Sequence, residues 1–101
     1  MARAGTQSAP ITGTGTRTLV AGVAGKRIKV YSYLVVATAA GTVKFLNTGA
    51  ADLTGTMSFA ANGGASAPSG EDPWFSTAVG ASLDIATSAA TEGHLAYVIE
   101  P

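Results

Sequence analysis

The chain has 101 residues, no cysteine and a formal net charge of zero. This length is typical of a single domain, and the lack of cysteine excludes disulfide bonds as a source of stability. With only one histidine there is no convincing set of soft metal ligands, so we expect neither a metal centre nor another cofactor.

Small side chains dominate the composition. Alanine, glycine, serine and threonine account for 54 of the 101 residues (20, 13, 8 and 13). Few large apolar side chains remain to be buried, and each Å² of apolar surface removed from water contributes only roughly 25 cal/mol. Small domains with thin cores commonly gain stability from disulfides, metals or subunit contacts. Since the first two are not expected here, the composition favours an oligomer.

Opposite charges separate along the chain. All six basic residues precede all six acidic residues, the former being Arg3, Arg17, Lys26, Arg27, Lys29 and Lys44, the latter Asp52, Glu71, Asp72, Asp84, Glu92 and Glu100. Two explanations stay open: the halves pair within one domain, or a basic end of one subunit meets an acidic end of its neighbour. With zero net charge and no dense basic patch, we expect no nucleic-acid partner.

Residues 1–16 differ from the rest of the chain. Apart from the initial Met, Ile11 is their only large aliphatic residue, so they cannot form a core of their own. We expect an extended N-terminal arm that orders on a partner. No continuous apolar segment suggests a signal peptide, and no stretch approaches the roughly 18 apolar residues of a membrane span. The sequence therefore predicts synthesis in the cytoplasm and no membrane partner.

Residues 17–101 read as one β-domain. Short alternating or apolar runs are separated by turn signals such as Asn62-Gly63, and no window shows a helical apolar stripe. This pattern predicts a single-domain antiparallel β-sandwich, jelly-roll-like, with about eight strands. The expected strands cover residues 17–21, 26–38, 42–47, 52–60, 64–68, 73–78, 81–88 and 93–100.

Strand alternation also predicts which residues face inward. The expected core is Leu19, Ile28, Val30, Leu34, Val43, Phe45, Leu53, Met57, Phe59, Phe75, Leu83, Ile85, Leu95, Tyr97 and Ile99. An unbroken alternation through 26–38 places Tyr31, Tyr33 and Val35 on the opposite side from Ile28. That second side is too apolar for one that simply meets water, so we expect it to face a second sheet or a sister subunit.

No motif indicates catalysis. Residues 20–27 lack the first glycine and the final Ser or Thr of a phosphate-binding loop, and residues 13–16 lack the third glycine of a dinucleotide fingerprint. The only histidine, His94, is expected to be a polar residue of an edge strand. The sequence therefore predicts a protein that is not an enzyme.

Trp74 and Phe75 follow Pro73 and must point to opposite sides of a strand. One ring can fill the core while the other covers an edge or meets a partner, where aromatic residues are enriched. Three roles stay open for this pair: core packing, subunit contact and stacking against a sugar.

Several segments together carry a family resemblance. GKRIKVYSY (25–33), TVKFLNTG (42–49), DLTG (52–55), AANGG (60–64), PWFSTAVGASL (73–83) and GHLAYV (93–98) resemble small jelly-roll structural proteins of tailed bacteriophages, of the head decoration or cement type. The resemblance spans residues 18–100. It implies a homotrimer bound to the major capsid protein of a phage shell, located on the capsid surface of the virion.

The expected contacts with sister subunits or the shell are Arg3, Ile11, Arg17, Arg27, Lys29, Tyr31, Tyr33 and Trp74. A tail or fibre component, or an adhesin module that binds host carbohydrate, is the alternative. An enzyme built around His94 is the remaining rival.

Overall fold

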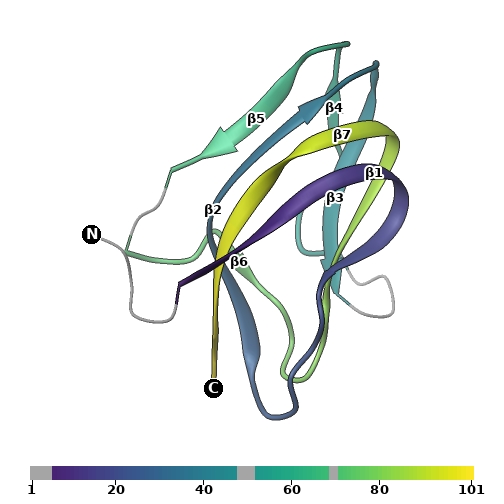
Figure 1. Cartoon of the computed structure of the whole chain (residues 1–101). Coiled ribbons are helices and arrows are strands. Elements are labelled where there is room, and N and C mark those ends of the chain that lie inside the picture. The colour runs from purple at the N-terminus through teal and green to yellow at the C-terminus, as the bar shows by residue number, and fades with distance from the viewer. Residues whose placement is uncertain (1–5, 48–51, 69–70) are drawn as a thin grey trace.

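A computed structural model describes residues 6–47, 52–68 and 71–101. The described residues form seven strands and no helix (Figure 1). Their bounds are β1 Gln7–Val20, β2 Arg27–Ala37, β3 Gly41–Asn47, β4 Met57–Phe59, β5 Gly64–Ala67, β6 Phe75–Ser76 and β7 Leu83–Glu100. All strand pairs are antiparallel, so the predicted all-β, antiparallel class is confirmed.

The last strand, β7, is the centre of the sheet. On one side it pairs with β1 along nearly its whole length, from Gln7 opposite Tyr97 to Val20 opposite Leu83. On its other side the first part of β7 pairs with β3, and the later part pairs with β2. The outer strands β4, β5 and β6 attach to β3 or β2. The first and last strands of the chain are therefore neighbours.

Both β1 and β7 bend, and the bend folds the sheet over on itself (Figure 1). In β1 the bend lies at Gly13–Gly15, where the register with β7 shifts and both glycines have positive φ. The two halves of the sheet then face each other. Tyr33 of β2 lies 5.5 Å from Phe45 of β3, centroid to centroid, and Phe75 of β6 lies 5.0 Å from Phe45. This aromatic cluster joins the halves.

The core follows the predicted alternation closely. Every residue expected to face inward is buried in the core or packs against it, with the exception of Leu34. The fully buried large side chains include Ile11, Ile28, Val35, Phe45 and Leu95. Leu34 was predicted to be inward, and this is wrong: 40% of its surface is exposed.

A β-bulge at Tyr31 explains the error. Val30 pairs with Tyr97, but the next pair along β7 is Ser32 with Ala96, which leaves Tyr31 as an extra residue in β2. A bulge shifts the inward-facing positions of a strand by one. Val30 therefore faces the core before the bulge, and Tyr33 and Val35 face it afterwards. Tyr33 and Val35, which were predicted on the second side of this strand, therefore meet the other half of the same sheet.

The strand boundaries differ most from the prediction in β1 and β7, and the strands expected at 52–60 and 73–78 shorten to β4 and β6. Residues 7–16, expected in an arm, form most of β1 and pair with β7. Segments 81–88 and 93–100, expected as separate strands, are parts of the continuous β7. Gly93 lies within β7 rather than at a turn. A Cβ at this position would overlap the Leu34 carbonyl oxygen of β2. The close approach of the two strands requires glycine.

The turn at Asn62 is confirmed. Asn62 has a φ of 65°, as the Asn-Gly signal predicts. The backbone N–H of Asn62 donates to the Ala37 carbonyl, and the backbone N–H of Gly63 donates to the Ala60 carbonyl. These hydrogen bonds fix the entry into β5.

The bulge predicts opposite responses from two adjacent residues. Val35→Ala should lower the free energy of unfolding by about 2 kcal/mol, because Val35 is fully buried and its loss leaves a cavity. Leu34→Ala should cost less than about 1 kcal/mol, because this larger side chain is already partly in water. Urea unfolding of both variants measures the difference. The reverse order would show that β2 alternates without a bulge.

Candidate binding surfaces

The structure places the eight predicted contact residues in different environments. Arg3 lies outside the described residues. Ile11 is fully buried in the core, and the half-buried Tyr33 packs against that core. Tyr31, the bulge residue, is also buried. Sequence alternation could not separate buried from exposed positions here, because both the bulge and the pairing of β1 were unforeseen.

The basic residues divide into paired and unpaired groups. Lys29 lies 3.1 Å from the Glu100 carboxylate, and Lys44 lies 3.1 Å from that of Asp52. These pairs support the explanation in which the basic and acidic halves meet within one chain. Lys26 and Arg27 are exposed and form no ion pair within the described part of the chain. They are therefore available to an acidic partner.

Two loops form an exposed apolar tip beside these cations. The tip consists of residues 21–25, between β1 and β2, and residues 78–81, before β7; Figure 1 shows the two loops side by side at the lower end. The Gly80 amide donates to the Lys26 carbonyl at 2.7 Å, which ties the loops together. Val23 and Val79 are 40% and 53% exposed. These two exposed side chains belong to loops that lie together, and contiguous exposed apolar surface marks contact sites.

Trp74 is the most exposed large apolar residue identified in the described chain, at 54%. Its backbone amide donates to the Val30 carbonyl, and its indole N–H donates to the Pro68 carbonyl at 2.9 Å. Its neighbour Phe75 turns inward against Phe45, as expected for adjacent strand residues. Trp74 is therefore a fixed exposed ring, which suits contact with a partner or stacking against a ligand and rules out a core role.

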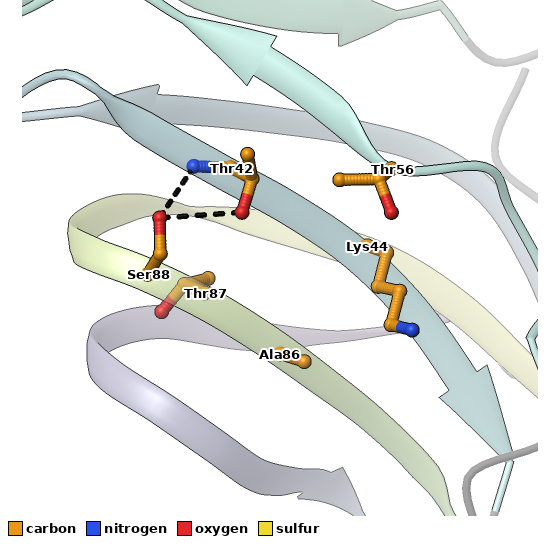
Figure 2. Close-up of a pocket in the computed structure, with 6 residues that line it drawn as sticks. All are labelled: Thr42, Lys44, Thr56, Ala86, Thr87 and Ser88. Atoms are coloured by element: carbon orange, nitrogen blue, oxygen red, sulfur yellow. Dashed lines mark hydrogen bonds between the residues drawn. The ribbon is translucent and has the colours of Figure 1, made fainter.

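A shallow groove of about 330 Å³ lies over β3 and β7 (Figure 2). Hydroxyl groups dominate its lining, which consists of Thr42, Lys44, Thr56, Ala86, Thr87 and Ser88. The Ser88 hydroxyl accepts from the Thr42 amide at 2.8 Å and lies 3.2 Å from the Thr42 hydroxyl. Since Lys44 is paired with Asp52, much of this polar lining is already satisfied within the chain. The groove contains no aromatic face.

Arg17 lies at the bend of the sheet. Its guanidinium donates to the Gly15 carbonyl at 2.6 Å and to the Thr87 hydroxyl at 3.0 Å, with a longer contact of 3.4 Å to the Thr91 hydroxyl. Burial lowers the pKa of Arg17 from its usual value. None of these partners is a carboxylate, so the charge of Arg17 is not neutralised by them.

A second hollow, of about 230 Å³, opens beside Arg17. Both halves of the bent strand β1 line it, through Pro10, Thr12, Arg17, Thr18 and Leu19. It combines apolar side chains, hydroxyls and one cation. Such a lining suits an amphipathic group that carries a negative charge.

His94 lies exposed on β7, opposite Leu34 and Pro10 on the neighbouring strands. Neither neighbour is a carboxylate or a nucleophile. In the described ranges, no group of three or more His, Cys, Asp or Glu residues is arranged to hold a metal ion. No helix in the described chain is long and apolar enough to cross a membrane.

Comparison with known proteins identifies no relative: no protein-family model, curated protein or solved structure matches the chain.

Arg17 should stabilise the bend of the sheet. We expect Arg17→Ala to lower the free energy of unfolding by about 1–3 kcal/mol, because the hydroxyl of Thr87 and the Gly15 carbonyl lose a charged donor. Lys26→Ala, which removes an exposed and unpaired cation, should change it by less than about 0.5 kcal/mol. Thermal and urea unfolding compare the two variants. Equal small effects would show that the Arg17 hydrogen bonds are dispensable.

Proposed function

We propose that this chain is a structural protein of a bacteriophage virion, of the jelly-roll-like decoration or cement type. In this proposal it binds the major capsid protein on the outside of the head as an oligomer, and it stabilises the shell. The proposal combines the sequence resemblance in segments such as GKRIKVYSY and PWFSTAVGASL with the surfaces described above.

The observation that carries the proposal is the apolar tip with its adjacent cations. Val23 and Val79 are exposed on loops that a backbone hydrogen bond holds together, and Lys26 and Arg27 follow directly. A fixed apolar patch beside unpaired positive charge suits a protein surface that is apolar at its centre and acidic at its rim. An attachment protein needs such a patch, whereas an enzyme needs a set of reactive groups that converge on one site.

The thin core supports the same proposal. A chain in which more than half the residues are Ala, Gly, Ser or Thr buries few large side chains. Binding to a shell would stabilise the folded state by mass action, because the shell binds only folded copies. Linked copies would also bind with greater avidity than a single copy, so each tip needs to contribute only a modest contact.

Carbohydrate recognition by a tail component is the second candidate, and the exposed Trp74 ring is the observation in its favour. Sugar sites commonly combine an aromatic face with polar groups that hydrogen-bond the hydroxyls. Here the indole N–H already donates to Pro68, and the hydroxyl-rich groove is lined by other residues. The ring and the groove do not form one site, so the first proposal is better supported.

Sedimentation with empty heads tests the proposal. Heads should come from the phage or prophage whose genome carries the gene, with that gene deleted so that the heads lack the protein. We expect the purified chain to co-sediment with these heads. Binding should saturate at a whole number of copies for each equivalent site on the shell, and it should raise the melting temperature of the heads. Light scattering of the free protein gives the number of copies per binding unit, for which the resemblance implies three.

Two variants and one glycan array complete this test. Val23→Ser with Val79→Ser should weaken head binding at least tenfold, since both residues are exposed and the fold should persist. Ser58→Ala, an exposed position on β4, is the matched control and should bind normally. The proposal would be contradicted if the protein did not co-sediment with heads, or if its gene lay far from phage structural genes. Strong glycan binding that is lost in Trp74→Ala would also contradict it.

A further inference from the structure

The outer edge of β1 is open. Within the described residues, β1 pairs only with β7, which leaves the backbone on its other side without a strand over Gln7–Val20. The remaining edge strands are much shorter, with 3, 4 and 2 residues in β4, β5 and β6. A long unpaired edge is a template for another extended chain, and proteins usually shorten, charge or cover it.

Pro10 shows which backbone groups point outward. Residues of an antiparallel pair alternate between positions that bond the partner and positions that bond away from it. Proline has no N–H and is tolerated in a strand only where that group would point away from the ladder. Pro10 pairs with His94, so Ser8 and Thr12, two residues to either side, share its outward orientation. Their N–H and C=O groups face the open edge.

The side chains along this edge are small and uncharged. Ser8, Thr12, Thr16 and Thr18 are all exposed. Arg17, the single charged residue of β1, turns toward the bend, where it donates to Thr87 and lines the 230 Å³ hollow. An incoming strand would meet hydroxyls along the edge and one cation beside it.

We propose that the open edge of β1 binds an extended segment of the partner protein by strand addition, and that a carboxylate of this segment enters the hollow beside Arg17. The identity of the partner as the capsid shell protein rests on the proposed function. Main-chain hydrogen bonds to Ser8, Pro10 and Thr12 would fix the segment, and the carboxylate would set its register.

Charge and length favour this occupant over a second copy of the chain. The edges of β4, β5 and β6 are too short to match β1. Pairing of β1 with β1 of another copy would match in length, but it would bring two Arg17 hollows together with no anion between them. An acidic extended segment satisfies both the backbone and the cation.

Thr12→Pro tests the strand addition directly. It removes the outward N–H at a position where proline is compatible with the β7 ladder, so the protein should remain folded while its affinity for gene-deleted heads falls at least tenfold. Thr12→Val keeps the N–H and the side-chain shape, so it should bind more tightly than Thr12→Pro, and Ser58→Ala on β4 is the control that should bind within twofold of the wild type. Arg17→Gln should weaken binding and reduce its salt dependence, whereas Arg17→Lys should retain that dependence.

The outcomes separate the two proposals. If the wild type binds heads and Thr12→Pro binds equally well, strand addition is wrong and the proposed function stands. If the wild type does not bind heads, the proposed function fails and the inference about its contact fails with it. If Thr12→Pro does not fold, hydrogen exchange of the wild type bound to heads tests the strand addition instead. The amides of residues 7–20 should exchange more slowly on binding, and unchanged exchange there would overturn the inference.

Discussion

The fold depends on the pairing of β7 with β1, β2 and β3. β7 pairs with β1 on one side and with β3 and β2 in succession on the other, so it holds both halves of the bent sheet. With so many small side chains, the burial of apolar surface is limited. The backbone hydrogen bonds between β7 and its neighbouring strands are therefore important for holding the sheet together. The pairs join residues as distant as Gln7 and Tyr97. Such distant contacts require most of the chain to be present before the sheet closes.

Much of the core could be predicted from sequence because alternation is a local property. Ile28, Phe45 and Ile85 were correctly placed inside, since each lies in a run whose apolar residues recur at every second position. The bulge at Tyr31 could not be predicted, because one extra residue leaves no mark on composition and is defined only by the partner strand. The assignment of residues 7–16 failed for a related reason: they contain few apolar residues, and their pairing is set by β7 at the other end of the chain.

The candidate surfaces were predictable in part. The aromatic pair after Pro73 had to point to opposite sides of a strand, which left core packing and partner contact open, and Trp74 is the ring that is exposed. The tip and the open edge could not be found in this way. The loops that carry Val23 and Val79 are far apart in sequence and meet only because β1 and β7 are neighbours. Whether a strand lies at an edge is likewise a property of the whole sheet, so Ser8 and Thr12 gave no local signal.

The edge of β1 is open, but its sequence restricts which strands can pair with it. Pro10 removes one donor from the edge, and the positive φ values of Gly13 and Gly15 bend the strand, so a flat neighbouring strand cannot follow it over its full length. Exposed threonines add little apolar surface that would drive aggregation. A partner segment must instead match the bend, the missing donor and the position of Arg17 at once. Specificity at this edge therefore comes from the combined geometry of the backbone and one partly buried charge, and a strongly apolar edge would lose it.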